Sequence, residues 1–406
     1  MAEQHEKTLV PQIRFAGFTD PWEQRKLEDY VVVSTAKNVD GRFNKEDVLS
    51  VSGEYGIVNQ IAFQGRSFAG SSVLNYGIVN TGDIVYTKSP LNSNPYGIIK
   101  VNKGIPGIVS TLYAVYRPQD NVHTNFIQVY FEQHERMNNY MHPLVNKGAK
   151  NDMKVTAENA LKGVVTFPSR EEQVIISEFF DRLDSLITLH QRKYDKLCVL
   201  KKSMLDKMFP KGGSLYPEIR FAGFTDPWEQ RKLGELFEEH SEKDRDDLPA
   251  LTIIQGGGTV HRDESNRNLQ FDRSSLSNYK VVDTGDFIVH LRSFEGGLEK
   301  ATCYGLVSPA YHIFRGKNVD SDFYYLYFRS KRFIDVDLKP HVYGIRDGRS
   351  IDIEGMKTIF IPWTNLAEQR QIGAFFDYLD SLITLHQRKL ELLRNIKKSM
   401  LDKMFV

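Results

Sequence analysis

Cysteine is scarce in this sequence, and long apolar runs are absent. The 406 residues include only two cysteines, Cys198 and Cys303, with no Cys-x-x-Cys pair. This excludes a disulfide framework or a cysteine-based structural zinc site and is typical of a reducing cytoplasm. No apolar stretch reaches the roughly 20 residues of a membrane span, and the first residues lack the apolar centre of a signal peptide. We therefore expect a cytoplasmic protein without a membrane segment.

An excess of charge of one sign is also missing. The formal net charge is +1, from 53 Lys and Arg against 52 Asp and Glu. Any nucleic-acid-binding surface must therefore concentrate its basic residues locally. With 41% hydrophobic and 26% charged residues, the composition is that of a globular protein, and the length predicts two or three domains.

Motifs for catalysis are missing as well. There is no GxxxxGK[ST] phosphate loop, and the eleven histidines show no metal-ligand spacing. Asn94-Pro95-Tyr96 is one proline short of the Asn-Pro-Pro-aromatic signature of adenine methyltransferases. The stretch Asp335–Lys339 contains the Asp-x-Lys triplet of some metal-dependent nucleases, but such triplets are frequent by chance. We expect no catalytic residue, no cofactor and no metal in this chain.

What the sequence does contain is a duplication. The segment IRFAGFTDPWEQRKL at Ile13–Leu27 recurs unchanged at Ile219–Leu233, and Phe179–Phe209 recurs with few differences at Phe375–Phe405. We call the first kind of repeat the head, the second kind the tail, and the sequence between them the body. The heads lie 206 residues apart and the tails 196. The chain therefore has the order head, body, tail, twice, with a second half that is shorter between head and tail.

The head predicts a short helix. Asp20 can cap it, Pro21 suits the first helical position, and Glu23 has the spacing of a capping box. Trp22, and Trp228 in the second copy, would then be apolar anchors. They would attach the body to a neighbouring part of the chain or contact a partner subunit.

The tails predict long helices that pair. Ser169 with Glu172 and Asn365 with Glu368 have capping-box spacing. Seam positions then follow at alternating four and three spacing, as in a coiled coil, with Lys201 as the polar exception. In the first tail the other seam residues are Leu183, Ile187, His190, Tyr194, Leu197, Met204 and Met208. Acidic residues gather where each helix begins and lysines where it ends. This gradient favours an antiparallel pair, each helix being about 60 Å long.

The two bodies share a skeleton beneath different loops. Asn75–Tyr86 (NYGIVNTGDIVY) matches Asn278–Val289 (NYKVVDTGDFIV), and both predict a strand, a Gly-Asp turn and a second strand. The GIVS at Gly107 matches GLVS at Gly305. The connecting loops differ and are rich in Gly, Asn and charge; the glycine-rich stretch Gln255–Val260 is expected to be a mobile loop that faces DNA. The bodies are thus predicted to be one fold with two surfaces.

This plan resembles the specificity subunit of type I restriction–modification systems. The resemblance is carried by the heads, the TGD(I/F) hairpins, the Glu-Gln pairs at Glu172 and Glu368, and LDSLITLHQRK…KKSML in both tails. It implies an α+β fold: two similar target-recognition domains of mixed α/β type with small twisted sheets, separated by two long antiparallel helices that form a coiled coil with pseudo-twofold symmetry. The implied boundaries are 1–168 and 214–364 for the recognition domains and 169–213 and 365–406 for the helical spacers.

The resemblance also implies a function without catalysis. Each recognition domain would bind one half of a bipartite, asymmetric site in double-stranded DNA, while the helical regions would set the spacing and dock two methyltransferase (modification) subunits. Restriction subunits, which are ATP-dependent translocases and nucleases, would join them. Two alternatives stay open from the residues: a self-sufficient sequence-specific methyltransferase or nuclease, and a coiled-coil adaptor that does not bind DNA.

Candidate site residues follow from residue type and position. Donors to phosphate or guanine in Gly- or Asn-rich loops are the DNA-binding candidates: Lys37, Arg42, Lys45, Arg66, Lys88, Lys147, Lys150, Asn151 and Lys154 in the first body, and His261, Arg262, Arg267, Arg292, Lys339, Arg346 and Arg349 in the second. Apolar residues of the repeats are the candidates for subunit docking: Trp22, Trp228, Leu186, Leu189, Leu200, Leu382, Leu385 and Ile396.

Overall fold

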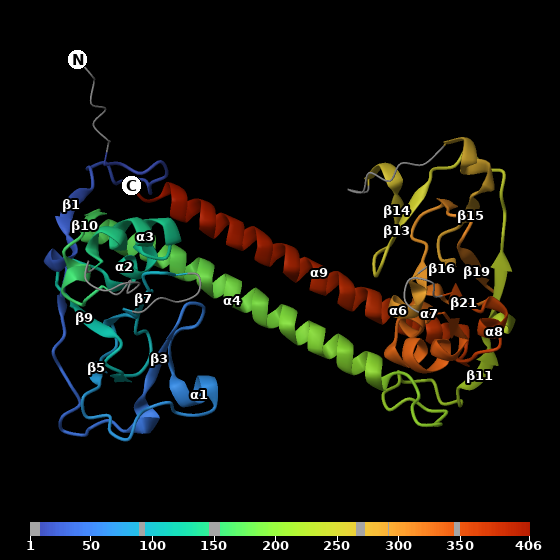
Figure 1. Cartoon of the computed structure of the whole chain (residues 1–406), viewed down its shortest axis with the longest axis horizontal. Coiled ribbons are helices and arrows are strands. Elements are labelled where there is room, and N and C mark those ends of the chain that lie inside the picture. The colour runs from blue at the N-terminus through green and yellow to red at the C-terminus, as the bar shows by residue number, and fades with distance from the viewer. Residues whose placement is uncertain (1–8, 89–93, 146–154, 265–272, 291, 345–349) are drawn as a thin grey trace, which may run out of the picture. The chain divides into compact units, whose positions relative to one another are not determined.

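The computed structural model of the chain (Figure 1) describes residues 9–88, 94–145, 155–264, 273–290, 292–344 and 350–406. It divides into two compact units, residues 1–191 with 388–406, and residues 192–387. Each unit contains one head, one body and half of each tail. Among the described residues, no helix is both long and apolar enough to cross a membrane.

The tails form two helices of 38 residues each, α4 (Arg170–Lys207) and α9 (Leu366–Lys403). Each begins with a side-chain cap: Ser169 Oγ accepts from the N–H of Glu172, and Asn365 Oδ1 accepts from the N–H of Glu368. The predicted capping box is wrong in its other half. Both glutamate carboxylates instead bind arginines of the heads, because those charged partners bind them more strongly than a backbone N–H.

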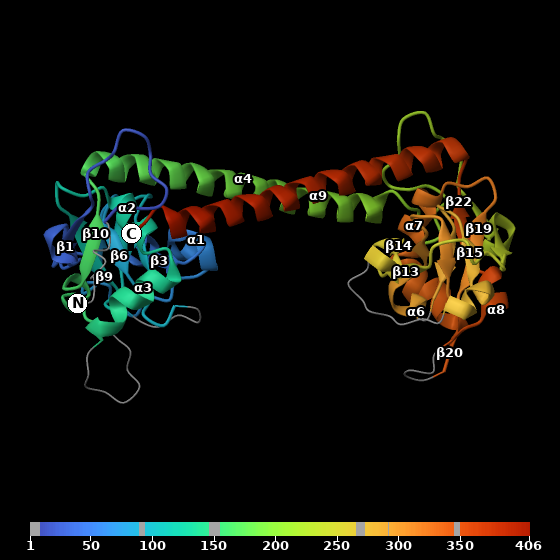
Figure 2. The same ribbon diagram turned by 90° about the horizontal axis from the view of Figure 1, so that it is seen from above.

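The helices run antiparallel within each unit (Figures 1 and 2). In the first unit, Lys397 near the end of α9 lies 2.6 Å from Asp184 near the beginning of α4. In the second unit, Lys201 near the end of α4 lies 2.5 Å from Asp380 near the beginning of α9. The charge gradient along the tails therefore pairs opposite charges, as the sequence predicts.

The first body is built on a four-stranded antiparallel sheet of order β2-β9-β6-β7, with two-stranded ladders β3-β4 and β5-β8 beside it. The strands are β2 (Val31–Val33), β3 (Leu49–Ser52), β4 (Gly56–Asn59), β5 (Gly77–Val79), β6 (Ile84–Tyr86), β7 (Ile99–Val101), β8 (Gly107–Val109) and β9 (Ala114–Pro118). The helices are α1 (Gln60–Gln64), α2 (Thr124–Tyr130) and α3 (His134–Met141). Short 3-10 turns lie at Leu27–Asp29, Lys45–Asp47, His142–Leu144 and Asn159–Leu161.

The second body repeats this topology with the sheet β12-β19-β16-β17 and the ladders β13-β14 and β15-β18. Its strands are β12 (Phe237–His240), β13 (Leu251–Ile254), β14 (Gly258–His261), β15 (Lys280–Val282), β16 (Phe287–Val289), β17 (Glu299–Lys300), β18 (Gly305–Val307) and β19 (His312–Gly316). Its helices are α5 (Leu233–Leu236), α6 (Ser293–Gly296), α7 (Ser321–Phe328) and α8 (Ile353–Lys357). A π-helical turn lies at Phe333–Leu338, and 3-10 turns lie at Arg262–Glu264, Arg273–Asn278 and Lys339–His341. The strands β20 (Val342–Tyr343) and β21 (Ser350–Ile351) form a small ladder. The two bodies are therefore one α+β fold.

The Gly-Asp segments are not hairpins, although each is a strand, a turn and a strand as predicted. β5 pairs with β8, whereas β6 pairs with β7 and β9. β15 and β16 are separated in the same way. Asp83 and Asp286 are buried and each accepts the backbone N–H three residues earlier, so the turn directs the second strand into another sheet.

The glycine that begins each GIVS or GLVS motif is required by a close approach of backbone. A Cβ at Gly107 would lie 2.5 Å from the carbonyl oxygen of Asp47, and a Cβ at Gly305 would lie 2.6 Å from that of Pro249. The equivalent strands cross equivalent loops in both bodies. A shared backbone crossing thus explains a motif that survives while the surrounding loops differ.

The predicted head helix is wrong. Glu23–Lys26 forms strand β1, which pairs with β10 (Val164–Phe167), and β11 (Glu229–Lys232) pairs with β22 (Phe360–Trp363) in the second unit. Local capping signals are outweighed by the ladder because the last strand of each body offers a full set of backbone partners. The helical turn comes after the strand, at Leu27–Asp29 in the first copy.

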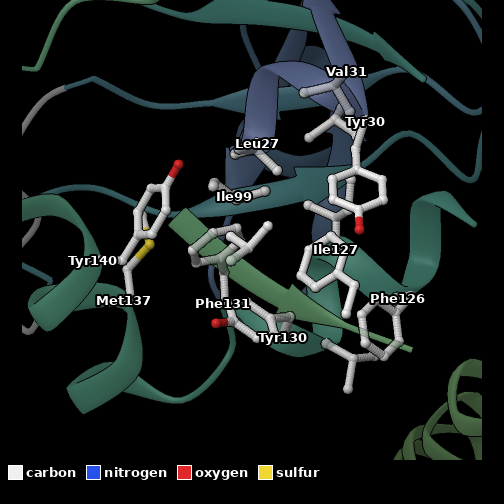
Figure 3. Packing of buried hydrophobic residues seen from close by; sticks show 14 of the residues in the cluster. Leu27, Tyr30, Val31, Ile99, Phe126, Ile127, Tyr130, Phe131, Met137 and Tyr140 are labelled. Atoms are coloured by element: carbon white, nitrogen blue, oxygen red, sulfur yellow. The ribbon is translucent and has the colours of Figure 1, made fainter. Parts of the chain in front are cut away.

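The core of the first unit is strongly aromatic (Figure 3). Figure 3 shows Phe126 and Tyr130 of α2 among the apolar side chains of the sheet and of α3. The ring of Phe405, which follows α9, lies 5.6 Å from that of Phe126 and 5.9 Å from that of Trp22. The body, the head and the end of the second tail therefore share one core.

Candidate nucleic-acid interface and docking surfaces

Each head is joined to a tail by a two-point ion pair. Arg14 places Nε 2.8 Å from Oε1 and Nη2 2.7 Å from Oε2 of Glu172. Arg220 makes the same pair with Glu368, at 2.7 and 2.8 Å. Both glutamates are fully buried. The fork of the guanidinium fixes orientation as well as distance, so the head is held in one pose against its tail.

The glutamine after each glutamate joins the tail to the body. Gln173 donates through Nε2 to the carbonyl of Pro168 and accepts through Oε1 from the N–H of His123, the residue that precedes α2. Gln369 makes the same two bonds with Thr364 and Asp320. The repeated Glu-Gln pair is thus explained by contacts inside each unit, which bind head, body and tail together.

The end of each tail also packs on a head within the same unit. The N–H of Ile13 donates to the carbonyl of Lys403, and the N–H of Ile219 donates to that of Lys207, both at 3.0 Å. Trp228 lies 5.8 Å from Phe209 in the edge-on arrangement that Trp22 has with Phe405. Both tryptophans are 1% exposed. They are core residues, which agrees with the expectation that they attach the body to a neighbouring part of the chain and gives no support to their assignment as docking residues.

The remaining docking candidates differ in exposure. Leu186, Leu189, Leu200 and Leu385 are between 38% and 46% exposed. Leu382 and Ile396 are half-buried, and Ile396 packs against the core of the first unit. Two more apolar residues of the second tail, which the sequence analysis does not select, are also exposed: Tyr378 at 62% and Leu392 at 60%. They could have been found as apolar residues outside the heptad seam.

Four basic candidates of the first body are exposed: Lys37, Arg42, Lys45 and Arg66. The guanidinium of Arg42 lies 4.7 Å from the ring centre of Phe43, and that of Arg66 lies 4.6 Å from the ring centre of Phe68. Stacking on a ring orients a guanidinium and leaves its N–H groups free to face outward. This arrangement suits contacts with phosphate or a base edge.

A buried asparagine holds the loop that carries these residues. The side chain of Asn38 is fully buried; it donates to the carbonyls of Phe43 and Val73 and accepts from the N–H of Phe43. Phe43 and Ala69 then pack against the same small core of Val48, Val73 and Ile108. The loops that bear Arg42 and Arg66 are therefore brought to one end of the body, although they are separated in sequence.

Lys88 has a different environment from the other candidates. It is half-buried, and its Nζ donates to the carbonyl of Thr111 at 2.8 Å. Burial lowers the pKa of this amine. Lys88 is therefore tied to its own body. The candidates Lys147, Lys150, Asn151 and Lys154 lie outside the described residues.

In the second body, Arg292 and Lys339 are exposed, whereas His261 and Arg262 are half-buried. The guanidinium of Arg262 lies 3.5 Å from the carbonyl oxygen of Leu251. Arg292 immediately precedes α6, and its backbone N–H donates to the ring of His290. The candidates Arg267, Arg346 and Arg349 lie outside the described residues.

The glycine-rich stretch of the second body, expected to be a mobile loop that faces DNA, contains a hydrogen-bonded turn. It joins β13 to β14, with the N–H of Gly257 donating to the carbonyl of Ile254 at 2.9 Å. The N–H of Gly256 donates to the buried carboxylate of Glu299 at 2.7 Å. Gln255, Gly256 and Gly257 are nevertheless exposed. The turn is fixed at its base and open at its tip.

The Asp-x-Lys triplet is not assembled as a catalytic site. Asp337 accepts from the hydroxyl of Tyr327 at 2.7 Å, while Lys339 is exposed on a 3-10 turn. Across the described part of the chain, no cluster of three or more His, Cys, Asp or Glu residues has the arrangement to hold a metal ion.

Known proteins similar to this chain include specificity subunits of type I restriction enzymes. Residues 19–198 match the family model of the type I restriction modification DNA specificity domain. Two relatives from Methanocaldococcus jannaschii are named as specificity subunits of type I restriction enzymes. The MjaX subunit, whose assignment is provisional, is 21% identical over 98% of this chain and 95% of its own length. The MjaVIII subunit is 24% identical over 59% of this chain and 60% of its own length.

A solved structure shares the fold. The crystal structure of the type I restriction–modification S subunit from M. genitalium is 12% identical, with a TM-score of 0.51 over 98% of this chain and 99% of its own. The second half of the present chain carries the same strand order, ion pair and tail helix as the half that contains the matched domain. Residues 19–198 thus match the DNA specificity domain of type I restriction–modification systems, and the whole chain is similar to specificity subunits of these systems.

Proposed function

We propose that this chain is the DNA-recognition subunit of a type I restriction–modification complex, in which each body recognises one half of a bipartite, asymmetric site. One observation carries the proposal: a single strand order occurs twice, and each copy presents different exposed residues at the same places. A shared frame with different surfaces is what two different half-sites require. The modules proposed for this division of labour are 1–168, 169–213, 214–364 and 365–406.

The proposal assigns binding to this chain and chemistry to its partners. The helical regions would dock two methyltransferase subunits and fix the distance between half-sites, and restriction subunits would complete the complex in the cytoplasm. Support for docking comes from the exposed leucines of α4 and α9, which remain after the seam and the heads are packed. A self-sufficient methyltransferase or nuclease finds less support, since its motifs are missing from the sequence.

DNA methylation in a cell that carries the chain and its methyltransferase partner tests this function. Base-resolution sequencing should show one bipartite motif with a fixed gap. Replacing residues 234–361 with the second body of another specificity subunit should change one half of the motif and keep the other. A motif altered in both halves would contradict the division between bodies.

Duplex binding separates this function from that of a coiled-coil adaptor. Affinity for DNA that contains the motif should fall steeply as salt rises, because contacts with phosphates release counterions. Affinity that does not depend on salt, or no affinity in the presence of the methyltransferase, would favour the adaptor. Native mass spectrometry of the complex should show two methyltransferase subunits for each copy of this chain.

A further inference from the structure

The buried Glu299 on β17 stands at a position whose charge is reversed between the bodies. On the neighbouring strand, Val85 pairs with Lys100 in the first body, and the equivalent Ile288 pairs with Glu299 in the second. The charge of the residue that follows the equivalent helix is also reversed: Glu132 follows Phe131, whereas Arg329 follows Phe328. The Lys and Glu at these two positions of the first body are thus Glu and Arg in the second.

The two bodies differ in the groups that these charged side chains bind. In the first body, Glu132 accepts from Lys397 of the second tail at 2.8 Å. In the second body, Arg329 binds Glu299, and Tyr325 donates its hydroxyl to the other carboxylate oxygen at 3.0 Å. Glu299 also accepts the N–H of Gly256. The second body therefore uses its buried pair to hold the turn between β13 and β14.

Gly256 in the turn and Gly258 at the beginning of β14 lie close to this frame. A Cβ at Gly256, where φ is +79°, would lie 3.0 Å from Nη2 of Arg329. A Cβ at Gly258, where φ is +72°, would lie 3.0 Å from the carbonyl oxygen of Lys300. A Cβ at Gly296 of α6 would collide with the carboxamide of Gln255. The bare Gly296 thus leaves the space in which the Gln255 side chain lies.

The same hairpin of the first body presents different chemistry. β3-β4 and β13-β14 have the same register, with Leu49 opposite Asn59 and Leu251 opposite His261. The tip of the first hairpin carries Tyr55, which is 60% exposed, where the second is formed by glycines beside an exposed Gln255. Equivalent tips with different side chains are where two recognition surfaces on one frame would differ.

We propose that Gln255 is a specificity-determining residue of the second body, which hydrogen-bonds the edge of an adenine, and that the Glu299–Arg329 pair positions its turn. This inference rests on the proposed DNA-recognition function. A carboxamide offers one donor and one acceptor, which match N7 and N6 of adenine in the major groove. Gly256 and Gly257, which follow Gln255 at the tip, let the backbone approach the DNA closely, and the Glu299–Arg329 pair holds the turn in place.

The test is the methylated motif of cells that express the full chain with its methyltransferase partner. Gln255→Ala should relax one adenine-containing position in one half-site, with a loss of roughly tenfold to a hundredfold in discrimination there. The other half-site should stay intact. Gln371→Ala, which removes another exposed glutamine, is the matched control. An unchanged motif with Gln255→Ala overturns the inference, while a wild-type chain that yields no bipartite motif overturns the proposed function instead.

Two further variants test the positioning. Gly296→Ala fills the space of the Gln255 carboxamide on a backbone that tolerates alanine, and should relax the same position as Gln255→Ala. Glu299→Lys with Arg329→Glu installs the charge order of the first body, so the fold should persist while the turn loses its acceptor. The expected result is relaxed recognition in the same half-site with a melting temperature within a few degrees of wild type. A motif that stays strict in Gly296→Ala overturns the positioning.

Discussion

Arg14 and Glu172 form a fork-to-fork ion pair in which the arginine side chain is 12% exposed and the glutamate side chain 1%. Arg220 and Glu368 repeat it in the second unit, at 12% and 0%. Each pair connects a head to the beginning of a long helix, just before the tail repeat, and so gives an internal reason for the identity of the two heads. The repeats need not be kept similar by an external partner alone.

Removal of Arg14 should destabilise the first unit strongly. In Arg14→Ala, the buried carboxylate of Glu172 loses its charged partner, which costs about 3–5 kcal/mol. Urea unfolding of the full chain measures this loss. Arg25→Ala is the matched control, because Arg25 and its partner Glu23 are exposed and such a pair contributes less than about 1 kcal/mol. Equal effects of the two substitutions would refute the role given to Arg14.

The lysines of the two tail ends should differ in importance, although they occupy equivalent positions. Lys397 binds both Glu132 and Asp184 and is 15% exposed, whereas Lys201 binds Asp380 and is 31% exposed. We expect Lys397→Met to cost about 2 kcal/mol and Lys201→Met less than about 1 kcal/mol. The comparison uses denaturant midpoints at one pH. A larger loss from Lys201→Met would contradict the structure.

Stability of the second unit should depend on pH through His290. Burial, with a smaller effect from Arg292, lowers the pKa of this imidazole from 6.5 to about 4. The unfolded chain then binds the proton first, so stability falls as the pH drops from about 6.5 to about 4. In His290→Asn, which retains an acceptor for the N–H of Arg292, this slope should flatten. Thermal unfolding between pH 7 and pH 4 measures it, and an unchanged slope would show that other groups dominate.

Arg66 should contribute to DNA affinity through a phosphate or a base. If the proposed function holds, Arg66→Ala should weaken binding to the motif and lower the slope of log affinity against log salt by about one when the lost contact is a phosphate. Phe68→Ala should have a smaller effect in the same direction, because it removes only the ring on which Arg66 stacks. Lys193→Ala, an exposed residue of α4 outside the bodies, should leave the slope unchanged.

Local patterns were sufficient for the tails and for the duplication. Helix periodicity, the caps at Ser169 and Asn365 and the charge gradient all act over a few residues or along one helix, so they can be recognised without knowing the fold. The antiparallel pairing of Lys397 with Asp184 and of Lys201 with Asp380 follows from the same gradient.

Other features depend on residues far away in the chain. The head segment Glu23–Lys26 carries helix signals, yet it is a strand because Val164–Phe167 offers backbone partners. The sequence leaves open whether Trp22 attaches the body to a neighbouring part of the chain or contacts a partner, and its burial against Phe126 and Phe405 places it in the core of its own unit. No local rule anticipates the strand or chooses between the two roles of the tryptophan.

The sequence by itself determined the repeated plan, the helical spacers and the resemblance to a known family, because those depend on periodicity and on motifs that can be recognised along the chain. Only the tertiary structure decided which side chains share a surface. The loops that bear Arg42 and Arg66 pack, through Phe43 and Ala69, on one core that contains Val73 and Ile108. Glu299 comes beneath Gly256 through strand register. Burial and charge pairing are properties of the packed chain, in which neighbours are set by sheets and cores and not by distance along the sequence.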